Sequence, residues 1–271
     1  MLKVIAIVTM IIDHIGYYFE GYMPNFIYLI LRAIGRMSMP LFVFLIVQGF
    51  FHTSDLKKYI LRLFSLGVIT QALIFIVSRL DSNAYNLSVN KQLNVVFSYT
   101  LSLIVLWLIH EKVIIKKFSY NQNMFTKIIL FMVILGIYLF IPFDYGVYVP
   151  LLIIMFYFIE KLKISIYLQR QDYNMSVKKV VSSMLTEEHI KLGYIALMVI
   201  AILIIIIQSA NPLYWYMLLS IIPIYLYNGE RGKKNNLIKW SFYLVFPIQH
   251  FLLYLLSVVI WKIVYDSTGN Y

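Results

Sequence analysis

Four ionisable residues near the N-terminus have types and spacing that could do chemistry. Asp13 and His14 are adjacent in the first apolar segment, and Arg32 and Arg36 are four residues apart in the second. Residues four apart lie on one face of a helix, about one turn from each other. A charge within an apolar, membrane-depth helix is costly, so such residues are candidates for a functional site.

Each of these side chains has an expected role. His14 can take a proton near neutral pH and so act as a general base. The two arginines suit a bidentate hold on a carboxylate, a phosphate or a developing oxyanion. Asp13 would hold an arginine or orient a nearby group. The competing interpretation is an ion pair of Asp13 with Arg32 or Arg36 that only ties the two segments together.

A proline follows Arg36 by four residues. Pro40 has no N–H, so the carbonyl of Arg36 loses the partner that a continuous helix would give it. The sequence therefore predicts a kink or break next to Arg36.

Further polar residues in apolar surroundings extend the candidate site. His250 follows Pro247 in the last apolar segment and is a candidate catalytic residue with the first four, although a lone histidine there would be structural. Three others are expected toward the outer side as acceptor-site or supporting residues: Gln71, Asn94 and Asp144. No metal site is predicted, because no spacing typical of metal ligands is present.

Composition places these residues in a membrane protein. Of the 271 residues, 62% are hydrophobic and 13% are charged, whereas about a quarter are charged in soluble domains. We predict a multi-pass protein of the cell (plasma) membrane with one domain over residues 1–271. The absence of cysteine excludes disulfides, thiolate metal sites and a cysteine nucleophile.

The expected fold is an all-α helix bundle. We count nine apolar segments that could span a bilayer, some of them short. The second is long and polar at its start, which indicates a broken helix. The nine segments are 2–19, 26–51, 57–79, 92–111, 126–143, 146–160, 191–208, 213–228 and 238–263.

Charge sets the expected orientation. If the N-terminus is cytoplasmic and the C-terminus is outside, 18 of the 23 Lys and Arg side chains fall on the cytoplasmic side and three outside, as membrane proteins prefer. The net charge of +11 then needs no nucleic-acid partner, and membrane lipid is the expected contact. The longest loop is predicted between 161 and 191, with a possible surface helix near 175–185.

A basic turn rich in glycine follows the eighth apolar segment. Backbone N–H groups and cations in such a turn can hold phosphate. A loop that only obeys the positive-inside rule has the same composition. The candidate phosphate-binding residues are Gly229, Arg231, Gly232, Lys233 and Lys234.

Several motifs together resemble the TraX family. They are LKVIAIVTMIIDHIG and RAIGRMSMPLFVFLIVQGFFHTSDLKKYILRL near the N-terminus, LNVVFSYTLSL and DYGVY in the middle, and YNGERGKKNNLIKWSFYLVFPIQH near the C-terminus. The combination of DHIG with RxIGRxxxPLFxFL is specific, and the later motifs are weaker when taken alone. The resemblance covers most of the chain in order, apart from 161–190.

The resemblance implies a function. TraX-like proteins are associated with acetylation of the N-terminus of pilin, and they look related to transmembrane acyltransferases that use cytoplasmic acetyl-CoA. The motif positions that carry over are Asp13, His14, Arg32, Arg36, Asn94, Asp144, Asn228, Gly229, Glu230, Arg231, Gly232 and His250. The match is looser after Arg62, where the family often has Ser, then an acidic or amide residue, then Pro, and this chain has Thr70-Gln71-Ala72 with no acid at Gln71.

The expected activity is therefore transfer of an acetyl or other acyl group. Acetyl-CoA would be the co-substrate, no metal is expected, and the acceptor would be an amine or hydroxyl of a pilin, another peptide or a glycan. Two other functions fit the same buried residues: a secondary transporter or proton-coupled carrier, and a non-catalytic assembly factor of a conjugation or secretion system.

Overall fold

The computed structural model describes residues 1–79, 92–111, 114–172, 187–227 and 236–268. Every regular element in these ranges is a helix, and one isolated bridge pairs Leu93 with Phe143. The predicted all-α fold is confirmed. The elements are α1 (Leu2–Tyr18), α2 (Asn25–Gly35), α3 (Ser38–His52), α4 (Leu56–Ser78), α6 (Val95–His110), α7 (Tyr120–Phe140), α8 (Tyr148–Asp172), α10 (Glu187–Ser209), the 3-10 helix η2 (Pro212–Ser220), α11 (Ile221–Tyr225) and α12 (Asn236–Thr268).

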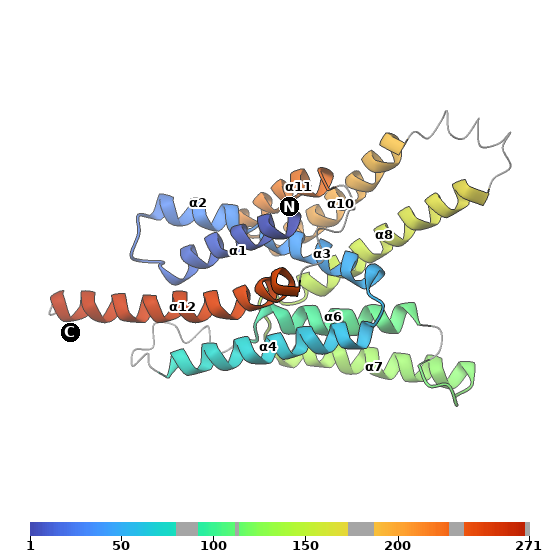
Figure 1. The fold of residues 1–271 in the computed structure, drawn as a ribbon, viewed down its shortest axis with the longest axis horizontal. Coiled ribbons are helices and arrows are strands. Elements are labelled where there is room, and N and C mark those ends of the chain that lie inside the picture. Colours follow the sequence, from blue (N-terminus) through green and yellow to red (C-terminus); the bar gives the residue numbers. More distant parts are fainter. Residues whose placement is uncertain (80–91, 112–113, 173–186, 228–235, 269–271) are drawn as a thin grey trace.

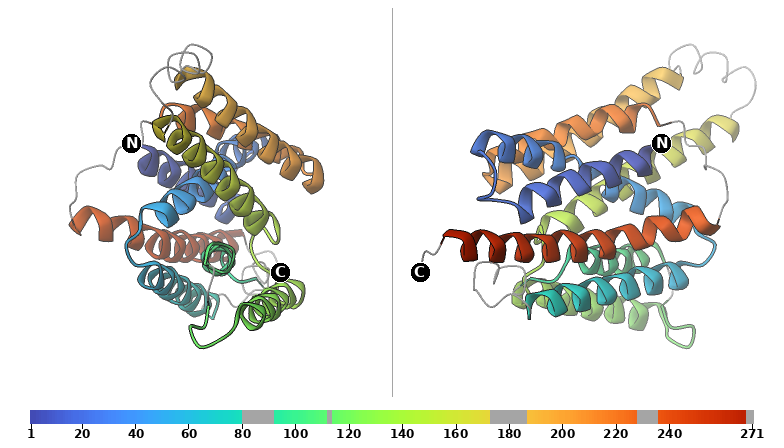
Figure 2. Two further views of the ribbon diagram at one scale, coloured as in Figure 1. Left: turned by 90° about the vertical axis from the view of Figure 1, so that its right-hand side faces the viewer. Right: turned by 60° about the vertical axis from the view of Figure 1, so that its left-hand side comes forward.

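The helices form two groups with a crossing pair between them. Figure 1 shows α4, α6 and α7 along one side of the molecule and α1, α2, α10 and α11 along the other. The long helix α12 runs between the groups and contacts both α4 and α1. Helices α3 and α8 cross obliquely and pack against each other, so they form the centre of the bundle (Figures 1 and 2).

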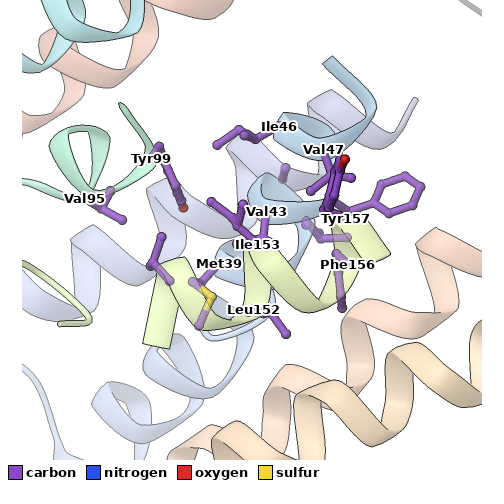
Figure 3. Packing of buried hydrophobic residues seen from close by; sticks show 14 of the residues in the cluster. Met39, Val43, Ile46, Val47, Val95, Tyr99, Leu152, Ile153, Phe156 and Tyr157 are labelled. Carbon is purple, nitrogen blue, oxygen red and sulfur yellow. The ribbon is translucent and has the colours of Figure 1, made fainter. Parts of the chain in front are cut away.

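Residues of α3, α6 and α8 build this centre. Met39 and Val43 of α3 pack with Tyr99 of α6 and with Ile153 and Tyr157 of α8 (Figure 3). All five are almost fully buried. In a bilayer the lipid is as apolar as these side chains, so close van der Waals packing is what holds the helices together. The packed centre gives the polar residues on α1, α2 and α12 a fixed support.

The predicted break in the second apolar segment is confirmed. Helix α2 ends at Gly35 and α3 begins at Ser38, with Arg36 and Met37 between them. Pro40 lies in the first turn of α3, where an N–H has no intrahelical partner and its loss costs nothing. The backbone therefore turns at Arg36.

Five of the described helical stretches are long and apolar enough to cross a membrane, so the chain is a multi-pass membrane protein. They are Asn25–His52, Leu56–Ser78, Tyr120–Phe140, Ile190–Ser209 and Tyr243–Val264. Nine spans and the N-in orientation stay predictions. Within the described part of the predicted segment 213–228, residues 213–225 lie in η2 and the five-residue α11 rather than in one regular helix.

The loop predicted between 161 and 191 is wrong at both of its ends. Helix α8 continues to Asp172 and α10 begins at Glu187. Lys and Glu are good helix formers, so the loss of hydrophobicity after 160 marks polar surroundings and not the end of a helix. The surface helix predicted near 175–185 lies outside the described residues.

Candidate functional site

Asp13 of α1 lies between the two arginines of the broken helix. Its Oδ2 is 2.9 Å from Nη1 of Arg32, and its Oδ1 is 3.7 Å from Nη2 of Arg36. The Arg32 Nη1 also donates to the backbone carbonyl of Asp13 at 3.2 Å. Arg32 is thus the tighter partner, although the sequence left open which arginine pairs with Asp13.

A glycine makes this contact possible. A Cβ added to Gly35 would lie 2.2 Å from the Cβ of Asp13. Helix α2 can therefore approach α1 closely only because residue 35 has no side chain. The approach places Asp13 beside the last turn of α2 and the turn at Arg36.

Two tyrosines hold Arg36. Its Nη1 donates to the hydroxyl of Tyr145 at 3.0 Å, and its guanidinium carbon is 5.5 Å from the Tyr145 ring centre and 5.6 Å from that of Tyr214. Tyr145 and Gly146 have positive φ values of 60° and 49° in the turn before α8. That turn aims the Tyr145 side chain at Arg36.

His14 is held by one face of α12. The Nε2 of Gln249 donates to Nδ1 of His14 at 2.8 Å. The ring of His250 is 4.1 Å from that of His14 between centroids, and Phe246 meets both rings edge-on. Because 246, 249 and 250 are spaced by three and four, they share one helical face.

His250 has its own partner on α1. Its Nδ1 is 2.8 Å from the hydroxyl of Tyr18, which is one turn after His14. Tyr18 is in turn stacked on Tyr254 of α12. The structure thus brings together all five predicted catalytic residues, and it adds Tyr18, Gln249, Tyr145 and Tyr214.

Some polar atoms of this cluster have no hydrogen-bond partner in the described part of the chain. Besides an oxygen of Asp13, they include the Nε of both arginines and the Oε1 of Gln249. Buried polar groups are nearly always hydrogen-bonded, so unpartnered ones in a single cluster mark a place where a ligand can bind.

Gln71 and Asn94 form a helix cap. The Gln71 Oε1 accepts from the backbone N and from Nδ2 of Asn94, both at 3.0 Å. The Asn94 Oδ1 caps α6 through the N–H of Val96, and its Nδ2 donates to the carbonyl of Gly67. These contacts join α4 to α6, which fits the supporting role and occupies the polar atoms that an acceptor would need.

Asp144 lies in the turn between α7 and α8, next to Tyr145. Its N–H donates to the carbonyl of Leu93 at 2.9 Å. Burial raises the pKa of its carboxyl to about 6, with a further rise from Asp13 and an opposing effect of Arg36. The second acid is therefore close enough to feel the charges of the Asp13 cluster.

The structure gives little information on metal binding or on the predicted phosphate-binding turn. The described residues hold no group of three His, Asp or Glu side chains that could bind a metal ion. The glycine-rich basic turn lies outside the described residues, together with Gly229, Arg231, Gly232, Lys233 and Lys234.

Sequence reasoning missed four members of the site for one reason. Each meets its partner through the fold, as Gln249 meets His14 across 235 positions. Weak signals did exist: Gln249 precedes His250 in FPIQHF, Tyr18 is four residues after His14, and Tyr145 lies in DYGVY.

Comparison with known proteins places the chain in a family. A family model described as TraX protein matches residues 1–257. A probable fimbrial assembly protein FimC, serogroup H1, of Dichelobacter nodosus is 44% identical over 72 residues, which are 26% of this chain and 28% of that protein. No solved structure matches. Because the family model covers nearly the whole sequence, this multi-pass membrane protein belongs to the TraX family.

Proposed function

We propose that this protein is a membrane-embedded acyltransferase. It moves an acetyl group from cytoplasmic acetyl-CoA to an amine or hydroxyl on the extracytoplasmic side. The observation that carries the proposal is the position of His14, which is fixed by α12 on one side of α1 while the Asp13–arginine cluster lies on the adjoining side. A base beside a cation is the arrangement that acyl transfer uses.

His14 is the general base in this proposal. The acceptor N–H or O–H attacks the thioester carbonyl, and His14 takes its proton. The bond from carbon to sulfur then breaks, and the same proton goes to the CoA thiolate. General base catalysis of this kind contributes about 10²- to 10⁴-fold to a rate.

Arg36 is the better of the two arginines for stabilising the oxyanion. Arg32 is bound to Asp13 by its side chain and backbone, whereas Arg36 is 3.7 Å from the carboxylate. The Nε atoms of both arginines have no acceptor in the described residues, so the contact with Asp13 is what distinguishes the two. A guanidinium held by Tyr145 and Tyr214 needs little reorganisation when negative charge develops on the carbonyl oxygen.

The donor and acceptor are less closely defined. The CoA diphosphate would bind the basic turn with Arg231, Lys233 and Lys234, where cations and glycine N–H groups are concentrated. The relative named as a fimbrial assembly protein favours an acceptor that belongs to a surface fibre, such as the N-terminus of a pilin. Another peptide or a glycan has the same nucleophilic groups.

The experiment is transfer of labelled acetyl from acetyl-CoA, with the purified protein in liposomes and membranes of the host cell as the acceptor source. His14→Ala should lower transfer at least about 100-fold. His52→Ala is the matched control and should transfer normally, because His52 caps the end of α3 by a bond to the Gln48 carbonyl, away from the site. Normal transfer by His14→Ala would reject the general base.

A second candidate, a non-catalytic assembly factor, is favoured by the printed name of the same relative. Binding of CoA separates the two functions. The acyltransferase should bind CoA, more weakly with added salt and after replacement of Arg231 and Lys233 together. Folded protein that binds no CoA at millimolar concentration would favour the assembly factor.

A further inference from the structure

The hydrogen bond between Gln249 and His14 decides what the histidine can do. A neutral imidazole has one N–H and one bare nitrogen, and the group facing one ring nitrogen fixes the state of both. Nδ1 of His14 faces the Gln249 amide at 2.8 Å. The amide therefore determines whether Nε2 carries the proton or is free to accept one.

The amide can present either of its two ends. In the structure its Nε2 donates to Nδ1, which puts the proton of a neutral His14 on Nε2 and leaves the ring unable to act as a base. If the amide turns by half a revolution, its oxygen accepts from an N–H at Nδ1, and Nε2 becomes the base. Oxygen and NH₂ are similar in size, so the turn leaves the packing unchanged.

Little else in the described chain fixes the amide in one orientation. Gln249 is 7% exposed, and its Oε1 has no hydrogen-bond partner there. A half-turn of the amide therefore breaks only the hydrogen bond from Nε2 of Gln249 to Nδ1 of His14. In its place the amide oxygen accepts a hydrogen bond from an N–H at Nδ1. The free end of the amide is left beside the site, where a substrate N–H, O–H or carbonyl can pair with it and select the orientation.

The contacts around His14 fix the orientation of its ring but not which ring nitrogen carries the proton. His250 covers the His14 ring at 4.1 Å, Phe246 meets it edge-on, and Tyr18 anchors His250. Rotation of the imidazole would disturb these contacts. The proton position is thus the property of His14 that is left adjustable, and Gln249 is the group that adjusts it.

We propose that Gln249 is a positioning residue that sets the tautomer of His14, with base catalysis taking place when its carbonyl faces Nδ1. The inference rests on the proposed acyl transfer. It also makes a structural claim of its own, that the group at position 249 decides which nitrogen of His14 carries the proton.

Two substitutions of similar size test this. An ionised Gln249→Glu side chain offers only acceptors to Nδ1, and Gln249→Met offers no hydrogen bond. Nitrogen-15 NMR of histidine-labelled protein in bilayers reports which ring nitrogen is protonated, and the His14 signals are those missing from His14→Ala. The same samples are assayed for kcat and for the KM for acetyl-CoA.

Gln249→Glu should move the His14 proton from Nε2 to Nδ1 and keep kcat within about tenfold of the unmodified protein. Gln249→Met offers no oxygen to accept from an N–H at Nδ1, so the proton should stay on Nε2. We therefore expect kcat to fall about 100-fold with the KM for acetyl-CoA unchanged, since this tautomer removes base catalysis. A residue needed only for packing would show no such split between the two variants.

Three results would overturn the inference: normal kcat in Gln249→Met, a proton that stays on Nε2 in folded Gln249→Glu, or equal losses in both variants. If Gln249→Glu does not fold, Gln249→Met decides through a loss of kcat at an unchanged KM for acetyl-CoA, and a loss in both parameters would overturn the inference. If the unmodified protein transfers no acetyl group, the proposed function fails, and the NMR comparison still shows whether position 249 controls His14.

Discussion

At the scale of single residues, the charges of the Asp13 cluster do not balance. One carboxylate faces two guanidinium groups, and its closer contact is with Arg32, whose Nη1 is 2.9 Å from Oδ2 of Asp13. Arg36 has the longer contact and relies on tyrosine for its remaining support. Its positive charge is therefore the one left to attract an anionic group, which is why we assign it the oxyanion.

Removing Asp13 should destabilise the protein. Asp13→Ala leaves the buried Arg36 and the partly buried Arg32 without their carboxylate, and breaking a buried pair in this way costs roughly 3–5 kcal/mol. We expect a lower melting temperature in detergent as well as loss of transfer. Both are measured on the same purified sample.

The choice of second substitution then separates the arginines. Asp13→Ala with Arg32→Met should regain most of the stability, because it removes the charge that lost the closer partner. Asp13→Ala with Arg36→Met should regain less, because Arg36 keeps Tyr145 and the ring of Tyr214. The opposite order would move the oxyanion role to Arg32.

Asp144 should make stability depend on pH. Its pKa in the folded protein is raised to about 6 from an ordinary value of 3.8. The folded state thus binds the proton more tightly than the unfolded state, and stability is lost as pH rises from about 4 through 6. Asp144→Asn should raise the melting temperature relative to the unmodified protein at pH 7.5 and change it little at pH 4.5.

Asp55 gives a control of opposite sign. This half-exposed residue caps α4, and the N–H and side chain of Lys58 lower the pKa of its carboxyl. Its stabilising effect is present above the ordinary pKa and is lost as pH falls. Asp55→Asn should therefore lower the melting temperature at pH 7.5, and equal effects of both asparagine variants would contradict the assignment.

At the scale of elements, the closest approach in the site is that of α1 and α2 at Gly35. A methyl group there would fall 2.2 Å from the Cβ and 2.3 Å from Oδ1 of Asp13, so the helices must separate. Overpacking of this kind costs about 1–3 kcal/mol. We expect Gly35→Ala to lower the melting temperature and to reduce transfer by displacing Asp13 from the arginines.

Gly136 of α7 provides the comparison. A Cβ at that position meets nothing within 4 Å. Gly136→Ala should be neutral or should stabilise the protein by up to about 1 kcal/mol, because alanine favours a helix. If both alanine variants behave alike, contact at Gly35 does not control the position of Asp13.

Local patterns explain which elements could be predicted. The break at Arg36 follows from Pro40, and the pairing of Asp13 with an arginine follows from charges in neighbouring apolar segments. The extension of α8 to Asp172 leaves no signal in hydrophobicity, since polar helix formers continue the helix. Gln249 and Tyr145 reach the site through tertiary packing, which periodicity within one segment does not encode.

At the scale of the whole molecule, the helix ends separate into two groups. In Figure 1 and the right-hand view of Figure 2, the C-terminal ends of α1, α4 and α12 lie toward one end of the molecule. The C-terminal ends of α3 and α8 and the start of α10 lie toward the other. Among the described residues that are predicted to be cytoplasmic, Lys57 and Lys58 follow the C-terminal end of α3, and Lys161 lies in the C-terminal half of α8. These cations therefore belong to the second end, as the predicted orientation requires.

This arrangement predicts which exposed positions face the outside of the cell. The chain has no cysteine, so one cysteine can be introduced at a time and labelled with a maleimide that does not cross membranes. Cysteine at Glu20 or Lys262 should react in intact cells, because these exposed residues lie near the C-terminal ends of α1 and α12. Cysteine at Lys58 or Lys161 should react only after permeabilisation.

Reaction at Lys58 in intact cells with protection at Glu20 would invert the topology, and the basic turn could then no longer meet cytoplasmic acetyl-CoA.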